Sequence, residues 1–122
     1  MAEILLIDDD AQMRRVVARI LREAGHSVHE AANGTEGLAL FRRVRSDLVV
    51  SDIVMPETEG IELIRTLRQE APALPILAVS GSPTALYLQA ATKLGASAAL
   101  RKPFAADKLL AMVNTLLAAA GV

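Results

Sequence analysis

Five short apolar segments alternate along this chain with five longer segments in which apolar residues recur at helical spacing. The short segments predict buried β-strands, and the longer segments predict amphipathic α-helices. The predicted strands span residues 4–7, 27–31, 48–52, 75–80 and 98–101, and the predicted helices span residues 11–24, 33–44, 61–71, 84–94 and 105–119. This alternation is typical of right-handed β-α-β units, which form a parallel sheet with helices on both faces.

The apolar content of the strands predicts their order in the sheet. Strands 4–7, 48–52 and 75–80 are almost continuously apolar, which favours the centre of the sheet, whereas 27–31 and 98–101 suit its edges. The order 2-1-3-4-5 satisfies these preferences and is one of the common doubly wound arrangements. The chain has 122 residues and no linker or repeat, so we expect a single α/β domain over residues 1–122.

Carboxylates follow two of the central strands at the points where those strands end. Asp8 and Asp9 come directly after the first strand, and Asp52 ends the third. These two strands flank the switch point of the predicted sheet, so the three acids are expected to converge in one crevice. Carboxylates at close range repel each other unless a cation lies between them, and Mg²⁺ prefers oxygen ligands. The sequence therefore predicts a Mg²⁺ site.

Ser80 and Lys102 are predicted at the ends of the fourth and fifth strands, beside the three acids. The Ser80 hydroxyl can donate a hydrogen bond to a phosphoryl oxygen, and the Lys102 ammonium can pair with Asp52 or with a phosphoryl group. A carboxylate beside a metal ion, a hydroxyl and an ammonium has the groups needed to form an aspartyl phosphate. Asp52 is therefore the candidate phosphoacceptor.

The sequence resembles the receiver domain of two-component response regulators, the family of the chemotaxis protein CheY, over essentially its whole length. The matching residues are the pair Asp8-Asp9, the segment 51–56 with Gly60 after it, Ser80, and the tripeptide Lys102-Pro103-Phe104. They occur in the family's order and at its spacing. The resemblance implies the flavodoxin-like fold of CheY.

The resemblance also implies a function. Asp52 would accept a phosphoryl group from a phosphohistidine on a histidine kinase or phosphotransfer protein, and the domain would then change conformation to signal. Mg²⁺ would be held by Asp9, Asp52 and the backbone carbonyl of Val54, with Asp8 acting through water. Ser80 and Lys102 would contact the phosphoryl oxygens, and Lys102-Pro103 would be a cis peptide. Such a domain promotes its own phosphorylation and dephosphorylation and is not an enzyme with a separate substrate.

Two positions depart from common family patterns. In the family, a polar side chain two residues after the phosphoacceptor can help to place the hydrolytic water, so Val54 predicts slow loss of the phosphoryl group. Many members carry an aromatic residue on the fifth strand that rotates during signalling, whereas this chain has Ala99 there. The segment after Ser80 and the fourth helix are therefore expected to relay the signal, with Tyr87 as a candidate participant.

The sequence also bounds the partners of this domain. The net charge of −1 gives no long-range attraction to nucleic acid or to anionic membranes, and no apolar run is long enough to span a bilayer. With no cysteine and no signal peptide, a cytoplasmic location is expected. The fourth and fifth helices carry more apolar residues than a core stripe needs, so Leu88, Ala99 and Met112 are expected to form one apolar patch for a homodimer or a target protein.

Helix 11–24 combines an apolar stripe with four arginines. Val16 is assigned to the apolar stripe together with Val17 and Leu21. The four arginines are expected on a solvated face, where they could make a modest contact with the phosphodonor: Arg14, Arg15, Arg19 and Arg22.

Two other functions compete with the receiver assignment. A Mg²⁺-dependent phosphohydrolase with an aspartyl-phosphate intermediate would need a second carboxylate two residues after Asp52, where this chain has Val54. An interaction module that works without phosphorylation would keep the fold but tends to lose the acids or the lysine. All of these residues are present here.

Overall fold

The computed structural model describes the chain except for residues 54–58 and 82–85 and the side chains of Glu59, Leu86 and Tyr87. Strands and helices alternate along the described chain as the sequence predicts. The elements are β1 (Glu3–Ile7), α1 (Ala11–Glu23), β2 (Ser27–Ala31), α2 (Gly34–Arg43), β3 (Leu48–Asp52), α3 (Glu59–Glu70), β4 (Ile76–Ser80), α4 (Leu86–Leu94), β5 (Ala98–Arg101) and α5 (Ala106–Ala119). No described helix has the length and apolar character needed to cross a bilayer.

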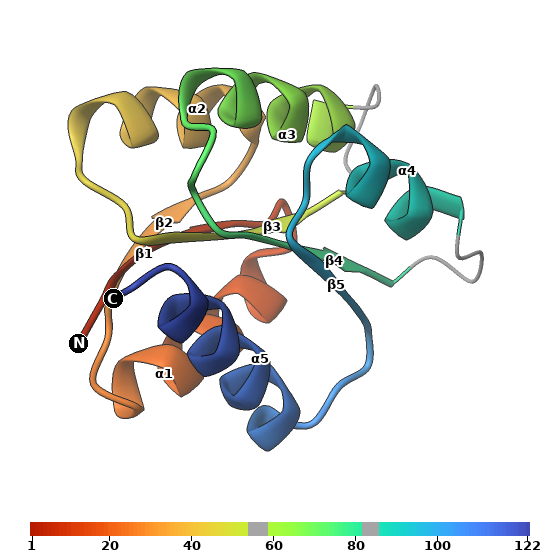
Figure 1. Cartoon of the computed structure of the whole chain (residues 1–122). Helices are drawn as coiled ribbons and strands as arrows, with labels where there is room; N and C mark the ends of the chain where they lie inside the picture. Colours follow the sequence, from red (N-terminus) through yellow and green to blue (C-terminus); the bar gives the residue numbers. More distant parts are fainter. Residues whose placement is uncertain (54–58, 82–85) are drawn as a thin grey trace.

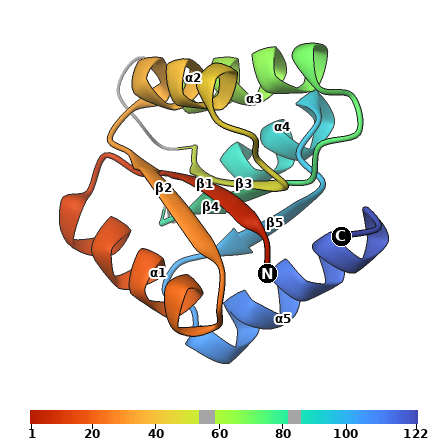
Figure 2. The same cartoon turned by 90° about the vertical axis from the view of Figure 1, so that its left-hand side faces the viewer.

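The strands form one parallel five-stranded sheet in the order β2-β1-β3-β4-β5, which confirms the predicted order (Figures 1 and 2). Residues of β1, β3 and β4 are almost all buried, whereas β2 and β5 include exposed positions. A central parallel strand is covered on both faces, so successive side chains are buried on opposite sides. Ile7 pairs with Ser51, and Asp52 pairs with Val79, so the strand ends that carry polar residues lie side by side.

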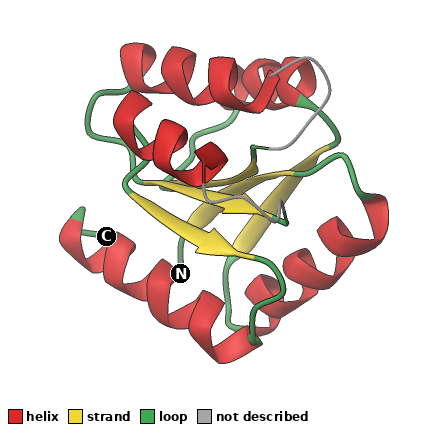
Figure 3. Cartoon of the chain, turned by 90° about the vertical axis from the view of Figure 1, so that its right-hand side faces the viewer, coloured by secondary structure: helices red, strands yellow, loops and turns green. Residues whose placement is uncertain are grey.

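Helices cover both faces of the sheet, with α1 and α5 on one face and α2, α3 and α4 on the other (Figures 1 and 3). Each face has its own apolar core. On the first face, Ile4, Leu6 and Val50 pack with residues of α1 and α5 such as Leu21 and Leu109. On the second face the core includes Leu5, Ile7, Val49, Ile64, Leu67 and Leu88. This division follows directly from the alternation of side chains along each strand.

Side-chain caps fix the starts of the first two helices. The Asp10 carboxylate accepts hydrogen bonds from the N–H groups of Gln12 and Met13, and the Asn33 side chain accepts one from Glu36 N–H. Both caps satisfy backbone donors that a helix cannot pair internally. They also fix where each helix leaves the carboxyl end of the preceding strand, which is the edge that carries the candidate site.

Gly60 has a packing role that the sequence did not indicate. A Cβ atom at this position would lie 2.5 Å from the Ile53 Cα atom and 2.6 Å from the Ile53 carbonyl oxygen. Only glycine allows the first turn of α3 to approach the backbone that follows β3 so closely. Gly60 therefore determines how α3 packs beside the end of the central strand.

One core assignment from the sequence is wrong. Val16 is 55% exposed, whereas its neighbours Val17, Ala18 and Leu21 are buried. Adjacent helical residues differ by about 100° around the axis, so a helix that buries Val17 and Leu21 turns Val16 toward solvent. The core stripe of α1 is narrower than its apolar content suggests.

Candidate functional site

The carboxyl ends of four neighbouring strands bring the predicted site residues together. Asp52 is the last residue of β3, Ser80 is the last residue of β4, and Asp8 directly follows β1. Lys102 directly follows β5, and its backbone N–H donates to the Ser80 carbonyl oxygen at 2.8 Å. The parallel sheet therefore concentrates at one edge the polar residues that the sequence places far apart.

Three carboxylates meet at this edge. Asp8, Asp9 and Asp52 each offer an oxygen atom, and these three atoms lie within 4.8 Å of one another. Asp8 and Asp52 are buried, with exposed fractions of 4% and 7%, whereas Asp9 is exposed. Two buried carboxylates and one exposed carboxylate thus form a crevice with its open side at Asp9.

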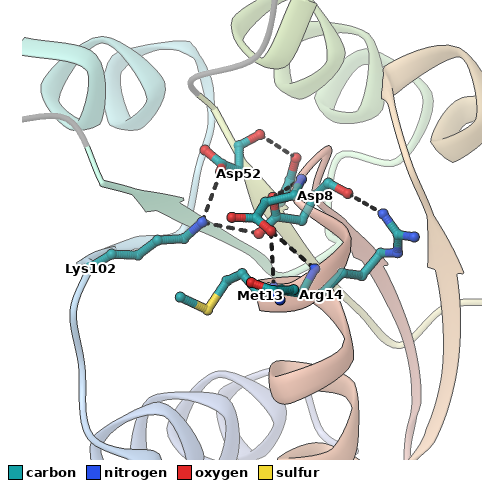
Figure 4. A network of polar contacts seen from close by, with 8 residues as sticks. Asp8, Met13, Arg14, Asp52 and Lys102 are labelled. Carbon is teal, nitrogen blue, oxygen red and sulfur yellow. Dashed lines mark hydrogen bonds and ion pairs between the residues drawn. The ribbon is translucent and has the colours of Figure 1, made fainter.

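The Lys102 ammonium bridges the two buried carboxylates. Its Nζ atom lies 2.9 Å from Asp52 Oδ2 and 3.0 Å from Asp8 Oδ2, and the lysine stem extends from the β5 side of the crevice (Figure 4). The side chain of Lys102 is 14% exposed. Burial acts to lower the pKa of Lys102, but its hydrogen bonds to the two carboxylates outweigh that effect and hold the pKa above its ordinary value.

For Asp8, the effect of burial outweighs that of the hydrogen bonds. Burial raises the pKa of its carboxyl group, although hydrogen bonds from the Asp10 N–H and from Lys102 act to lower it. Asp8 Oδ1 accepts the Asp10 N–H at 2.9 Å, while Oδ2 faces Lys102 at 3.0 Å. One ammonium therefore only partly compensates the negative charge in the crevice.

The floor beneath the crevice is closed and largely apolar. A void of only about 10 Å³ lies there, and apolar side chains such as Val17, Val50, Val79 and Phe104 line it together with Asp8, Asp52 and Lys102. A space of this size is at the lower limit for a single water molecule. This void therefore has no room for a ligand beside the polar groups of the site.

The other expectations for the site have mixed outcomes. Ser80 is 1% exposed, and the Lys102-Pro103 peptide is cis, as the resemblance implied. The backbone carbonyl of Val54 lies outside the described residues, as do the segment after Ser80 and the side chain of Tyr87. Their assigned roles stay predictions.

Arg14 belongs to this region, although the sequence pattern predicts a solvated position for it. Its Nη1 atom donates to the Asp8 carbonyl oxygen at 2.7 Å, and its side chain is only 18% exposed (Figure 4). By contrast, Arg15, Arg19 and Arg22 are exposed, as expected. A signal for this role was present, because helical side chains tilt toward the helix N-terminus, and Arg14 lies one turn after the Asp10 cap.

The donor set of the crevice matches the chemistry of Mg²⁺. The carboxylates of Asp8, Asp9 and Asp52 offer oxygen atoms only, without the nitrogen or sulfur ligands that favour zinc or copper. Mg²⁺ typically binds one or two carboxylates and keeps several waters, which suits a crevice that is open on one side. These residues therefore fit the metal that the sequence predicted.

Comparison with known proteins decides the family. Residues 4–114 match the family described as "Response regulator receiver domain". The chain belongs to this family. Response regulators are signalling proteins of two-component systems, and no relationship found supports the phosphohydrolase or the phosphorylation-independent alternative.

The curated relatives that match are longer than this chain. The response regulator MprA of Mycobacterium sp. (strain KMS) is 40% identical over 114 residues, which cover 93% of this chain and 50% of that protein. The probable transcriptional regulatory protein SilR of Salmonella typhimurium is 37% identical over 115 residues, covering 94% of this chain and 50% of SilR. The chain thus spans about half the length of the curated relatives it matches.

Solved receiver domains share the fold along nearly the whole chain. The CheY-like receiver domain protein from Methanospirillum hungatei JF-1 superposes with a TM-score of 0.93 at 28% identity, covering 99% of this chain and 97% of that one. The chemotaxis response regulator CheY4 of Vibrio cholerae gives a TM-score of 0.86 at 32% identity, covering 95% and 98%. The predicted CheY-like, flavodoxin-like architecture is confirmed.

Proposed function

We propose that this receiver domain accepts a phosphoryl group on Asp52 from a phosphohistidine of a histidine kinase or phosphotransfer protein, in a reaction that requires Mg²⁺. The observation that carries the proposal is the convergence of three carboxylates and one half-buried ammonium at the carboxyl end of the sheet. Family membership supplies the class of donor.

Transfer replaces a bond to nitrogen by a bond to oxygen. A carboxylate oxygen of Asp52 attacks the phosphorus atom, the phosphorus–nitrogen bond of the donor breaks, and its electron pair stays on the imidazole nitrogen. Bound Mg²⁺ would neutralise charge on the carboxylates and on the phosphoryl oxygens; Asp9 and Asp52 would hold it together with the backbone carbonyl of Val54, and Asp8 through water.

The chain's own residues orient the nucleophile and receive the new charge. Lys102 fixes Asp52 Oδ2 at 2.9 Å, which limits the directions that the carboxylate can take. After transfer, the Lys102 ammonium and the Ser80 hydroxyl are the groups that would contact the phosphoryl oxygens. The closed apolar floor beneath Asp52 leaves the open side for the donor.

Phosphorylation would also supply the signal. A phosphoryl group on Asp52 competes for the Lys102 ammonium that now bridges Asp8 and Asp52. Ser80 and Lys102 are joined through their backbones, so movement of either residue affects the ends of both β4 and β5. Ala99 of β5 has no rotamer to switch, so the change would pass to α4.

We place the partner surface at the β5 edge of the sheet, where the three residues expected to form the apolar patch line two grooves. Leu88 and Ala99 line a groove of about 390 Å³ on the α4 side, whereas Ala98 and Met112 line another of about 300 Å³ on the α5 side. Ala98 and Ala99 are adjacent on β5 and so face opposite sides of the sheet. Leu88 is also mostly buried, at 8% exposed.

Charge around this edge selects the kind of partner. Lys93 lines the first groove and Lys108 lines the second, and Arg101 is exposed at the end of β5. The sequence of α4, β5 and α5 contains one acid, Asp107. The edge is therefore apolar with a basic rim, although the chain as a whole has a charge of −1. We propose that a target protein with apolar side chains and an acidic rim binds here, because a second copy would add like charge.

Incubation with acetyl phosphate and Mg²⁺, followed by intact mass measurement, tests the phosphoacceptor. Wild type and the matched control Asp107→Asn should each gain one phosphoryl group, and Asp52→Asn should gain none. Excess chelator should prevent the gain. A full mass shift in Asp52→Asn, or in chelator, would refute the proposal.

Sedimentation of the phosphorylated domain tests the choice of partner. The phosphorylated domain should remain a monomer. It should bind a synthetic peptide of alternating leucine and glutamate more tightly than a peptide of alternating leucine and lysine. Lys93→Glu with Lys108→Glu should remove that preference while phosphorylation of Asp52 continues. Ala111 is exposed and lines the second groove. Dimers that dissociate in Ala111→Glu would assign the edge to a second copy instead.

A further inference from the structure

Arg14 closes the turn that carries two of the three acids. It lies on α1, yet its guanidinium extends back over the β1–α1 turn, and Nη1 donates to the Asp8 carbonyl oxygen at 2.7 Å. The Asp8 N–H donates to the Ala31 carbonyl oxygen of β2 at 3.1 Å, so both peptide groups of Asp8 are held from outside the turn. The turn is therefore anchored to both α1 and β2.

Glu30 of β2 holds Arg14 in this position. Arg14 Nε lies 3.3 Å from Glu30 Oε1, and the two side chains are 18% and 28% exposed. The other oxygen of Glu30 accepts Arg22 Nη1 at 3.0 Å, and Arg22 Nη2 donates to the Val28 carbonyl oxygen at 2.8 Å. Arg22 thus fixes Glu30, and Glu30 fixes Arg14.

We infer that Arg14 is a positioning residue for the metal site, acting through the Asp8 carbonyl to hold the carboxylates of Asp8 and Asp9 in the geometry that binds Mg²⁺. The inference rests on the proposed metal site. Asp8 Oδ1 accepts the Asp10 N–H, so the same turn that Arg14 anchors also sets the direction of the Asp8 carboxylate. Groups that orient metal ligands typically change affinity by about 10- to 100-fold when removed.

Geometry and charge predict opposite signs for the loss of Arg14. Removing a cation close to a Mg²⁺ site would tighten Mg²⁺ binding if charge alone mattered. Loss of the anchor would weaken it, because the carboxylates would have to be ordered when the ion binds. Arg15 provides a matched control, since it is the next residue of α1, carries the same charge and is exposed.

Calorimetric titration of the full chain with Mg²⁺ separates these accounts. Arg14→Met should bind Mg²⁺ about tenfold more weakly than wild type. Arg15→Met should bind as wild type does or slightly more tightly. Arg14→Lys, which keeps the charge and can reach one acceptor, should lie between wild type and Arg14→Met. If Arg14→Met does not fold, Arg14→Lys decides the question, and wild-type affinity in that variant would overturn the inference.

A second measurement on the metal-free protein does not depend on the proposed metal site. Hydrogen exchange of the Asp10 amide should be several-fold faster in Arg14→Met than in wild type or Arg15→Met. Equal exchange, or Mg²⁺ binding by Arg14→Met that is as tight as wild type, would contradict a positioning role. Failure of wild type to bind Mg²⁺ would instead refute the metal site itself, and the inference would fall with it.

Discussion

The two ends of the sheet both carry clusters of ionisable residues, but they balance charge in different ways. At the amino end, each described acid has its own partners. Glu3 Oε1 lies 2.9 Å from His29 Nε2, while Asp47 accepts the Glu3 N–H at 2.9 Å and pairs with Arg45 at 3.1 Å. The His29 hydrogen bond holds the pKa of Glu3 below its ordinary value. Charge at this end therefore supports the native structure.

At the carboxyl end, three carboxylates lie close together, and the Lys102 ammonium contacts two of them, Asp8 and Asp52. Asp8 and Asp52 are more deeply buried than any acid at the amino end, and burial raises the pKa of Asp8. A native structure tolerates crowded buried charge when another requirement outweighs the loss of stability. The difference between the two ends supports the proposal that the carboxyl end receives an additional cation and a phosphoryl group.

The largest expected effect comes from removing the Lys102 ammonium at the carboxyl end. Lys102→Met removes the ammonium that contacts two buried carboxylates. The free energy of unfolding in chelator should therefore fall by about 2–3 kcal/mol. This is less than the roughly 3–5 kcal/mol of a broken buried ion pair, because one carboxylate can take up a proton. Mg²⁺ should stabilise this variant more than wild type, because no ammonium competes for the carboxylates. Urea unfolding with and without Mg²⁺ measures both effects.

Lys108→Met is the matched control, since Lys108 is exposed on α5. Its free energy of unfolding should stay within about 0.5 kcal/mol of wild type in either buffer. If Lys102→Met matched that control in chelator, the carboxyl end would be no more strained than the amino end, and the comparison would fail.

A smaller effect of opposite sign is expected when one of the crowded acids loses its charge. The pKa of Asp8 is raised in the folded state, so the folded protein disfavours the charged form, and at neutral pH that charge lowers stability. Asp8→Asn should therefore raise the thermal midpoint in chelator by about 2–5 °C and reduce the further stabilisation by Mg²⁺. Differential scanning calorimetry with and without the ion measures these changes.

Asp47→Asn makes the same chemical change at the amino end. It removes the charge from a carboxylate that pairs with Arg45 and accepts the Glu3 N–H, so it should lower the thermal midpoint. Shifts of the same sign in both variants would show that the two ends do not differ in the way described.

The sequence was sufficient to predict the parts of the site that depend on chain order alone. In a parallel sheet, a residue at the end of a strand lies at a known edge, so Asp8, Asp52, Ser80 and Lys102 could be placed together before any coordinates. The same reasoning placed β2 and β5 at the edges, because their apolar content is lower.

Features that depend on the direction of single side chains were missed. Arg14 and Arg15 are adjacent and chemically identical, yet only Arg14 reaches the Asp8 carbonyl, because helix rotation separates the two by about 100°. The same rotation exposes Val16, and the alternation of Ala98 and Ala99 puts these two residues in different grooves. Composition alone does not determine these orientations.

The smallest expected effect concerns the exposed pair at the amino end. The folded-state pKa of Glu3 lies below its ordinary value of 4.5, so the pair contributes stability above that pH and loses it as the pH falls through the folded pKa. Glu3→Gln should therefore lower the thermal midpoint at pH 7 by roughly 1–2 °C, since exposed pairs contribute little. The difference from wild type should vanish on acidification, and a cycle with His29→Gln should assign it to this pair. Calorimetry across the acid range checks the sign of the pKa shift of Glu3. If the thermal midpoint of wild type rose further above that of Glu3→Gln on acidification, Glu3, like Asp8, would be disfavoured in its charged form.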